Sequence, residues 1–213
     1  MGSSTFGLAE HLVPALRLEE TAIIFRGRFA DGPFTFDGDH FPVRAVDGSP
    51  TPVQQPGPPI MIGGGGRTVL AVAARQADVV QLMPSNPDGR SSLDASQLSE
   101  AAIEEEVGWI RDAAGARFDD IDLSAQLLAC AVTDQPDERL SDFVERVAIV
   151  TVQMGGARVD ELHRSPIVAV GPLDEVCEKL VAVRDTYAIS YFVAPIDARP
   201  EILAPVIEAL ADA

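Results

Sequence analysis

Long apolar runs are missing from this sequence, and none approaches the ~18 consecutive apolar residues that a membrane-spanning helix needs. The N-terminus also lacks the basic and apolar blocks of a secretory signal. These two absences predict a cytoplasmic protein with no membrane partner.

Cysteine and basic residues are scarce. The two cysteines, Cys130 and Cys177, have no short spacing typical of a metal site, so we expect reduced thiols in the core and no bound metal. Sixteen Lys and Arg residues stand against 33 Asp and Glu residues, which gives a formal net charge of -17. The resulting negative field disfavours nucleic acids and anionic lipid surfaces as partners.

The chain does carry enough apolar sequence for one core, since 46% of its 213 residues are hydrophobic. We therefore expect a single α/β domain over residues 1–213. Strand and helix patterns alternate through the second two thirds, which is typical of parallel α/β architecture. Strands are expected at 59–62, 77–82, 121–132 and 189–194, with an extended piece at 167–170, and helices at 7–28, 67–76, 100–114, 138–154, 159–163, from 172 and at 199–211. This gives roughly four strand-helix units, about half the eight of a complete (β/α) barrel. Ser99 is a candidate N-cap for the helix of 100–114.

Two features precede that alternation. Pro14 interrupts the first helical pattern, so the helix has a possible later start at this proline. Residues 33–43 alternate apolar with polar around Asp37-Gly38, a pair that suits a turn with positive φ. This pattern predicts a β-hairpin, and the Pro-rich stretch 44–59 after it predicts a surface loop.

Four glycines, Gly63, Gly64, Gly65 and Gly66, end an apolar strand just before a helix. Such a turn gathers backbone N–H groups at the positive end of the helix, where they can hold a phosphate. Arg67 would add a charge-assisted hydrogen bond and Thr68 a hydroxyl. The alternative is a tight strand-to-helix turn with no ligand. Neither a P-loop nor a dinucleotide-binding pattern is present.

The chain resembles the luciferase-like flavin-dependent oxidoreductases in four segments that occur in the same order. The last two of these are similar to actinobacterial members that use a deazaflavin. The segments are FTFDGDHF (34–41), PPIMIGGGGRTVLAVAARQAD (58–78), WIRDAAGARFDDI (109–121) and YAISYF (187–192).

The resemblance implies a TIM-like barrel in which reduced coenzyme F420, or FMN in relatives, exchanges a hydride with a small organic substrate. It places the glycine-rich turn beside the cofactor phosphate. Relatives carry further strands before this chain's first helix, so we expect an incomplete barrel, the C-terminal part of a (β/α)8 fold, with about four parallel strands plus the hairpin. Acid-base residues from those strands have no counterpart here, and no catalytic residue is assigned.

In a barrel of this kind the site lies just past the C-terminal ends of the strands, which nominates Gln81, Met83, Thr133 and Asp197 as pocket neighbours. Gln81 and Met83 complete the predicted cofactor-binding set that begins at Gly63. The acidic run 104–106 has no second carboxylate motif beside it, so we expect a solvated helix face.

Two functions remain open. The first is a flavin- or deazaflavin-dependent oxidoreductase acting on a small molecule. The second is a catalytically silent half-barrel that serves as a binding or assembly module. An incomplete barrel exposes two strand edges, and one way to cover them is a homo-oligomer, which we expect here.

Overall fold

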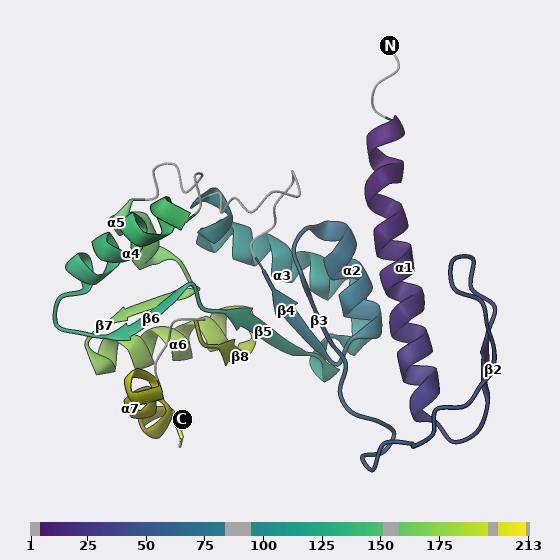
Figure 1. Ribbon diagram of the computed structural model, residues 1–213. Helices are drawn as coiled ribbons and strands as arrows, with labels where there is room; N and C mark the ends of the chain where they lie inside the picture. Colours follow the sequence, from purple (N-terminus) through teal and green to yellow (C-terminus); the bar gives the residue numbers. More distant parts are fainter. Residues whose placement is uncertain (1–4, 84–94, 151–157, 196–199, 212–213) are drawn as a thin grey trace. The chain divides into compact units, whose positions relative to one another are not determined.

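A computed structural model describes residues 5–83, 95–150, 158–195 and 200–211, in which helices alternate with strands (Figure 1). The elements in chain order are α1 (Thr5–Phe29), β1 (Phe34–Phe36), β2 (Val43–Val46), β3 (Met61–Gly64), α2 (Arg67–Gln76), β4 (Val79–Leu82), η1 (Ala95–Leu98), α3 (Glu100–Ala114), η2 (Gly115–Asp120), β5 (Asp122–Gln126), β6 (Ala129–Val132), α4 (Pro136–Val150), α5 (Val159–Arg164), β7 (Val168–Gly171), α6 (Leu173–Tyr187), β8 (Ile189–Val193) and α7 (Pro200–Leu210).

The fold class is α/β, as the alternation of strands and helices predicts. One sheet contains four parallel strands in the order β3-β4-β5-β8. Strands β6 and β7 pair in parallel as a second sheet, and β1 and β2 form the expected antiparallel hairpin. The described residues therefore contain the predicted four-stranded sheet and one further parallel pair.

The chain divides into two compact units. The first comprises Met1–Gly63, Arg67–Val80 and Trp109–Ile121, and the second comprises Gly64–Gly66, Gln81–Gly108 and Asp122–Ala213. The single domain expected over residues 1–213 remains a prediction.

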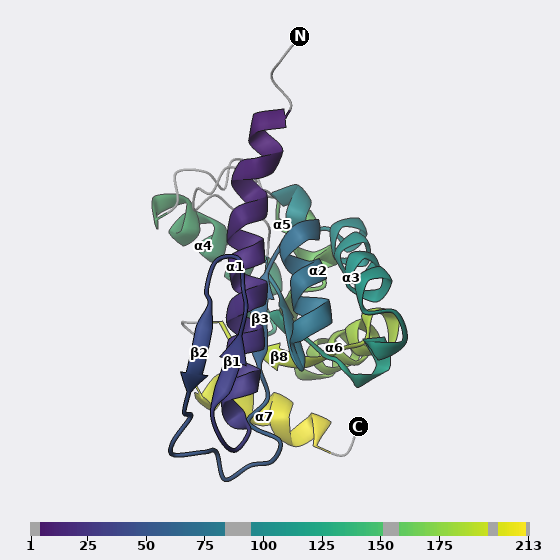
Figure 2. The ribbon, with the colours of Figure 1, turned by 90° about the vertical axis from the view of Figure 1, so that its right-hand side faces the viewer.

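In the first unit, α1 lies alongside α2 (Figures 1 and 2). Leu70, Ala73 and Ala74 of α2 are completely buried. Ala15 and Ala22 of α1 are also buried. The helix begins at Thr5 and contains Pro14, so the possible later start at this proline is wrong. An internal proline removes one backbone hydrogen bond, and tertiary packing of this kind offsets such a loss.

The hairpin is confirmed, but its second strand, β2, lies mostly in the stretch expected as a loop, and the expected reason for its turn is wrong. Asp37 and Gly38 lie in a six-residue loop between the strands, and Gly38 does not have a positive φ. The carboxylate of Glu20 on α1 accepts backbone N–H groups of Asp39, His40 and Phe41. A Cβ at Gly38 would lie 2.5 Å from the Glu20 carboxylate oxygen, so glycine is needed here for close approach.

In the second unit, the predicted long strand 121–132 is two strands, β5 and β6. The break falls where the backbone changes partners: the Leu127 N–H donates to Val193 O at 2.9 Å, and the Leu128 N–H donates to Ile167 O at 2.7 Å. β5 therefore pairs with β8, while β6 pairs with β7. A continuous apolar run in the sequence does not reveal this change of pairing partner, because both β5 and β6 contain buried residues.

Helices cover both faces of the β6–β7 pair. In Figure 1, α4 and α5 lie on one side of this pair, and α6 and α7 lie on the other. The core on the α6 and α7 side includes Cys130, so the expectation of a buried reduced thiol is confirmed for this residue, while Cys177 is partly buried. The buried residues of this cluster are Leu127, Cys130, Ala169, Val176, Leu180 and Val206.

Two glycines near the end of α3 provide a test of its helical conformation. Gly108 lies in the helix interior, and a Cβ there would meet nothing within 4 Å, so Gly108→Ala should raise the free energy of unfolding by about 0.5–1 kcal/mol. Gly115 follows the helix at φ +56°, so Gly115→Ala should lower it by about 1 kcal/mol. Equilibrium urea unfolding measures both changes, and a destabilised Gly108→Ala variant would contradict the first.

Candidate functional site

The glycine-rich turn connects β3 to α2. The strand runs through Gly63 and Gly64, two residues further than predicted, and α2 begins at Arg67 as expected. Gly66 has φ +77°, and a Cβ there would meet nothing within 4 Å, so its backbone conformation rather than crowding requires glycine. The turn thus has the strand, the left-handed residue and the following helix that an N-terminal anion site uses.

The first turn of α2 is open to an anion. It contains no acidic residue, and the side chains of Arg67 and Thr68 are both exposed. The first N–H groups of a helix have no partner within the helix, and they carry the positive end of its dipole. This chemistry fits a phosphate group.

Met83 lies beside this turn in the second unit. Its N–H donates a 3.0 Å hydrogen bond to the Gly64 carbonyl, so the structure brings these two predicted site residues together. The Met83 side chain is 39% exposed. Gln81 lies two residues earlier on β4 and is half-buried between the buried residues Val80 and Leu82.

Two other nominated pocket neighbours do not extend this set. Thr133 follows β6, but its hydroxyl accepts the Gln135 N–H at 3.1 Å, and its own N–H donates to Gly171 O at 2.8 Å. Its polar groups therefore shape the start of α4. Asp197 lies outside the described residues.

Glu106 is the residue of this region that sequence reasoning missed. Glu104 and Glu105 are exposed, as expected of a solvated face, but Glu106 is only 6% exposed. Helical spacing contains a signal for this burial, because Ile103 and Ile110 lie three residues before Glu106 and four after it, on the buried side of α3.

Burial dominates the acid-base behaviour of Glu106. It raises the pKa of this carboxyl to about 7, helped by the negative charge of Glu105, while the Gly66 N–H acts in the opposite direction. The glycine turn therefore has a neighbouring acid that titrates near neutral pH.

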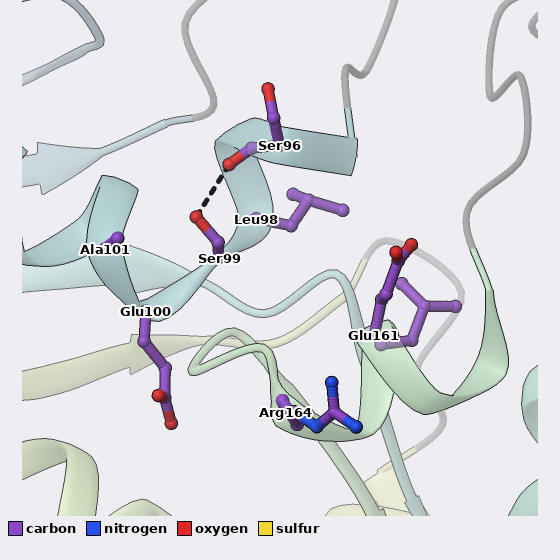
Figure 3. Close-up of a pocket in the computed structure, with 8 residues that line it drawn as sticks. Ser96, Leu98, Ser99, Glu100, Ala101, Glu161 and Arg164 are labelled. Atoms are coloured by element: carbon purple, nitrogen blue, oxygen red, sulfur yellow. Dashed lines mark hydrogen bonds between the residues drawn. The ribbon is translucent and has the colours of Figure 1, made fainter.

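A cavity of about 460 Å³ lies elsewhere in the second unit, between the start of α3 and α5 (Figure 3). Ser99 caps α3 as predicted, since its hydroxyl accepts the Ala102 N–H, and it also donates to Ser96 O. Leu98 and Arg164 point into the space between the two segments. The full lining is Ser96, Leu98, Ser99, Glu100, Ala101, Glu161, Leu162 and Arg164, so none of the predicted site residues lines this cavity.

Among the described residues, no group of three or more His, Cys, Asp or Glu side chains is arranged to hold a metal ion. None of the helices in the described ranges is both long enough and apolar enough to cross a membrane.

Comparison with known proteins identifies the family to which the chain is similar. The family described as luciferase-like monooxygenase matches residues 3–189. No curated protein matches the sequence.

Several solved structures share the fold. The coenzyme F420-dependent tetrahydromethanopterin reductase from Methanopyrus kandleri is 16% identical, with a TM-score of 0.66, over 92% of this chain and 62% of its own. The EDTA monooxygenase from Chelativorans sp. BNC1 is 15% identical, with a TM-score of 0.62, over 92% of this chain and 59% of its own. An F420-dependent secondary alcohol dehydrogenase, solved with an F420-acetone adduct, is 15% identical, with a TM-score of 0.55, over 88% of this chain and 60% of its own.

These structures are longer than the present chain, which spans less than two thirds of each of them. At this level of identity the similarity shows a shared fold only. This shared fold is consistent with the incomplete barrel expected from the sequence. The family match itself covers most of the sequence and includes the glycine turn. The chain therefore belongs to the luciferase-like monooxygenase family.

Proposed function

We propose that this chain binds the phosphate-bearing end of a flavin-type cofactor at the turn between β3 and α2. It would thereby support hydride transfer between the reduced cofactor and a small organic substrate. Coenzyme F420 is the preferred cofactor, and FMN is the alternative. The observation that carries the proposal is the glycine-rich turn at Gly63–Gly66, which leads into an α2 whose first residues, Arg67 and Thr68, are exposed, within a chain that belongs to this family.

The residues at the turn have separate roles in this proposal. Backbone N–H groups from Gly65 to Thr68 would hold the phosphate, and the Arg67 guanidinium would add a charge-assisted hydrogen bond. Gln81 and Met83 would border the bound cofactor from β4, where Met83 is already tied to Gly64.

The cofactor, when bound, supplies the hydride chemistry. The part played by this chain is to bind and orient it. Because the chain spans less than two thirds of the structures it resembles, the groups that hold the substrate and move protons are not assigned to residues here.

A binding or assembly module is the second candidate function. Strand β8 ends the order of the four-stranded sheet, and Tyr191 on this strand is 49% exposed. An open strand edge with an exposed aromatic residue suits pairing with another chain. In this case the glycine turn would bind no cofactor.

A fluorescence titration with coenzyme F420 and with FMN tests the proposal. We expect saturable binding by the wild-type chain, and we expect the Gly64→Asp variant to bind at least about tenfold more weakly, because a carboxylate beside the phosphate repels it. Gly115→Asp is the matched control: it adds the same charge at an exposed glycine whose left-handed conformation Asp tolerates. Binding of neither cofactor by the wild-type chain would favour the assembly module.

A further inference from the structure

The cavity between the start of α3 and α5 lies within the second unit and has an apolar part and a charged rim (Figure 3). Its volume of about 460 Å³ is in the range of pockets that hold small organic molecules. Leu98 and Leu162, one from each segment, are 2% and 1% exposed and form the apolar part of its wall. A ligand of this cavity therefore needs an aliphatic portion as well as charged groups.

Both segments that form the wall are fixed by hydrogen bonds. Ser99 caps α3. At the end of α5, the Lys179 ammonium group of α6 donates to the His163 carbonyl, and His163 Nε2 lies 2.8 Å from Asp137 Oδ1 of α4. A wall that is already ordered loses little conformational entropy when a ligand binds.

Glu161 and Arg164 place opposite charges on one side of α5. They are three residues apart, which makes them neighbours on a helix surface, and both line the cavity. Arg164 Nη2 lies 3.9 Å from Asp160 Oδ2, beyond hydrogen-bond distance, and the Arg164 side chain is 73% exposed. Glu161 Oε2 accepts the Arg158 N–H at 3.2 Å, and a carboxylate has acceptor sites for further donors.

Glu100, the third charged residue of the lining, has a cationic neighbour in the chain. Burial lowers the pKa of Lys179 to about 8, and the negative charge of Glu100 acts in the opposite direction, so these two groups lie near each other. Glu161 and Arg164 thus remain as the pair of charges for a ligand. A simple anion would be repelled by Glu161 and a simple cation by Arg164, whereas a zwitterion is attracted by both.

We propose that this cavity binds a free α-amino acid with an aliphatic side chain. The Arg164 guanidinium holds the carboxylate of the ligand, and the Glu161 carboxylate holds its ammonium group. The aliphatic side chain of the ligand lies against Leu98 and Leu162, where its burial adds to the affinity. This site goes beyond the proposed function, because no residue of the glycine turn takes part in it.

Calorimetric titration of the full chain with L-leucine tests the site. We expect saturable binding with a dissociation constant at or below about 1 mM. Isocaproate lacks the ammonium group of leucine, and isoamylamine lacks its carboxylate. Each should bind at least about tenfold more weakly than leucine, because it leaves one charged group of the cavity without a partner.

Two variants separate the charged contacts. Arg164→Gln should bind leucine at least about tenfold more weakly and should no longer prefer it to isoamylamine. Glu161→Gln should weaken leucine binding similarly and should no longer prefer leucine to isocaproate, while its amide oxygen still accepts the Arg158 N–H. Arg184→Gln is the control, since this arginine is 41% exposed and does not line the cavity, and it should bind leucine like the wild-type chain. Thermal unfolding without ligand confirms that each variant is folded.

Three results would overturn the proposal. The first is no binding of leucine by the wild-type chain, and the second is equal binding of leucine, isocaproate and isoamylamine. The third is leucine binding that neither Arg164→Gln nor Glu161→Gln weakens, because the ligand then lies elsewhere. These titrations contain no cofactor, so their failure leaves the proposed function of the glycine turn standing.

Discussion

Replacing Asp78 with alanine is expected to lower the free energy of unfolding by about 2–3 kcal/mol. Asp78 precedes β4, and its Oδ2 accepts the Ile60 N–H at 2.8 Å and the Arg26 guanidinium at 2.9 Å. Its own N–H donates to Ile60 O at 2.9 Å, so the starts of β3 and β4 are joined in both directions. Alanine keeps the backbone N–H bond to Ile60 O, but it leaves the Ile60 N–H without its acceptor and removes one of the two acceptors of Arg26.

The arginines around Asp78 extend the effect of this substitution. Arg26 also donates to Gln76 O at 2.9 Å, and Arg117 donates to Ala74 O and Ala77 O while its Nη2 lies 3.9 Å from Asp78 Oδ1. These carbonyls belong to the C-terminal end of α2, where cations are favourable. The carboxylate therefore neutralises two cations that hold this helix end.

Equilibrium urea unfolding at pH 7 measures the loss. Asp78→Asn should cost about half as much, since an amide oxygen still accepts the Ile60 N–H. Asp37→Ala provides the control, because it removes another Asp–Arg pair, with Arg44, in which Asp37 is 84% exposed. Its effect should lie within experimental error. Equal losses in Asp78→Ala and Asp37→Ala would show that Asp78 has no special role.

The second large effect concerns how stability varies with pH at Glu106. Burial, the largest cause, raises the pKa of Glu106 from its ordinary value of 4.5 to about 7 in the folded chain. Between these two values the folded state binds a proton that the unfolded state has lost, so the free energy of unfolding falls as the pH rises. This contribution is on the order of 2–3 kcal/mol, and it is fully present below pH 4.5 and lost as the pH passes 7.

Glu106→Gln carries no titrating group at this position. The stability of the wild-type chain relative to this variant should therefore decrease by that amount between pH 4.5 and pH 7 and then become constant. Urea unfolding of both chains across pH 4.5–8.5 gives the difference directly. The free energy of unfolding of Glu105→Gln, at the exposed neighbouring position, should vary with pH nearly as that of the wild-type chain does. If the free energy of unfolding of Glu106→Gln varies with pH in the same way as that of the wild-type chain, then Glu106 is not a buried acid.

Much of the fold follows from local sequence patterns. The helix of 67–76 has the predicted bounds, and the helix of 100–114 has both the predicted bounds and the predicted Ser99 cap. Apolar spacing and capping residues act over one or two turns, so a short window of sequence contains them. The glycine run likewise predicts a turn before a helix, because glycine is the residue that tolerates its left-handed position.

Other features depend on contacts between distant residues. The break between β5 and β6 reflects a change of partner from β8 to β7, and both partners lie more than thirty residues further along the chain. The loop of the hairpin is held by Glu20 rather than by Asp37-Gly38. The sequence around the β5–β6 break and around the hairpin loop contains no signal for these distant contacts.

By itself, the sequence determined the α/β class, the position of the glycine turn and the family resemblance, because each is carried by neighbouring residues or by a contiguous motif. The tertiary structure decided how deeply Glu106, in a run of three identical acids, is buried while Glu104 and Glu105 remain in water; helical spacing only indicates which side of α3 it lies on. The chemical identity of these three residues is the same. Their environment differs because burial and hydrogen bonding depend on which surfaces of α3 meet the rest of the unit.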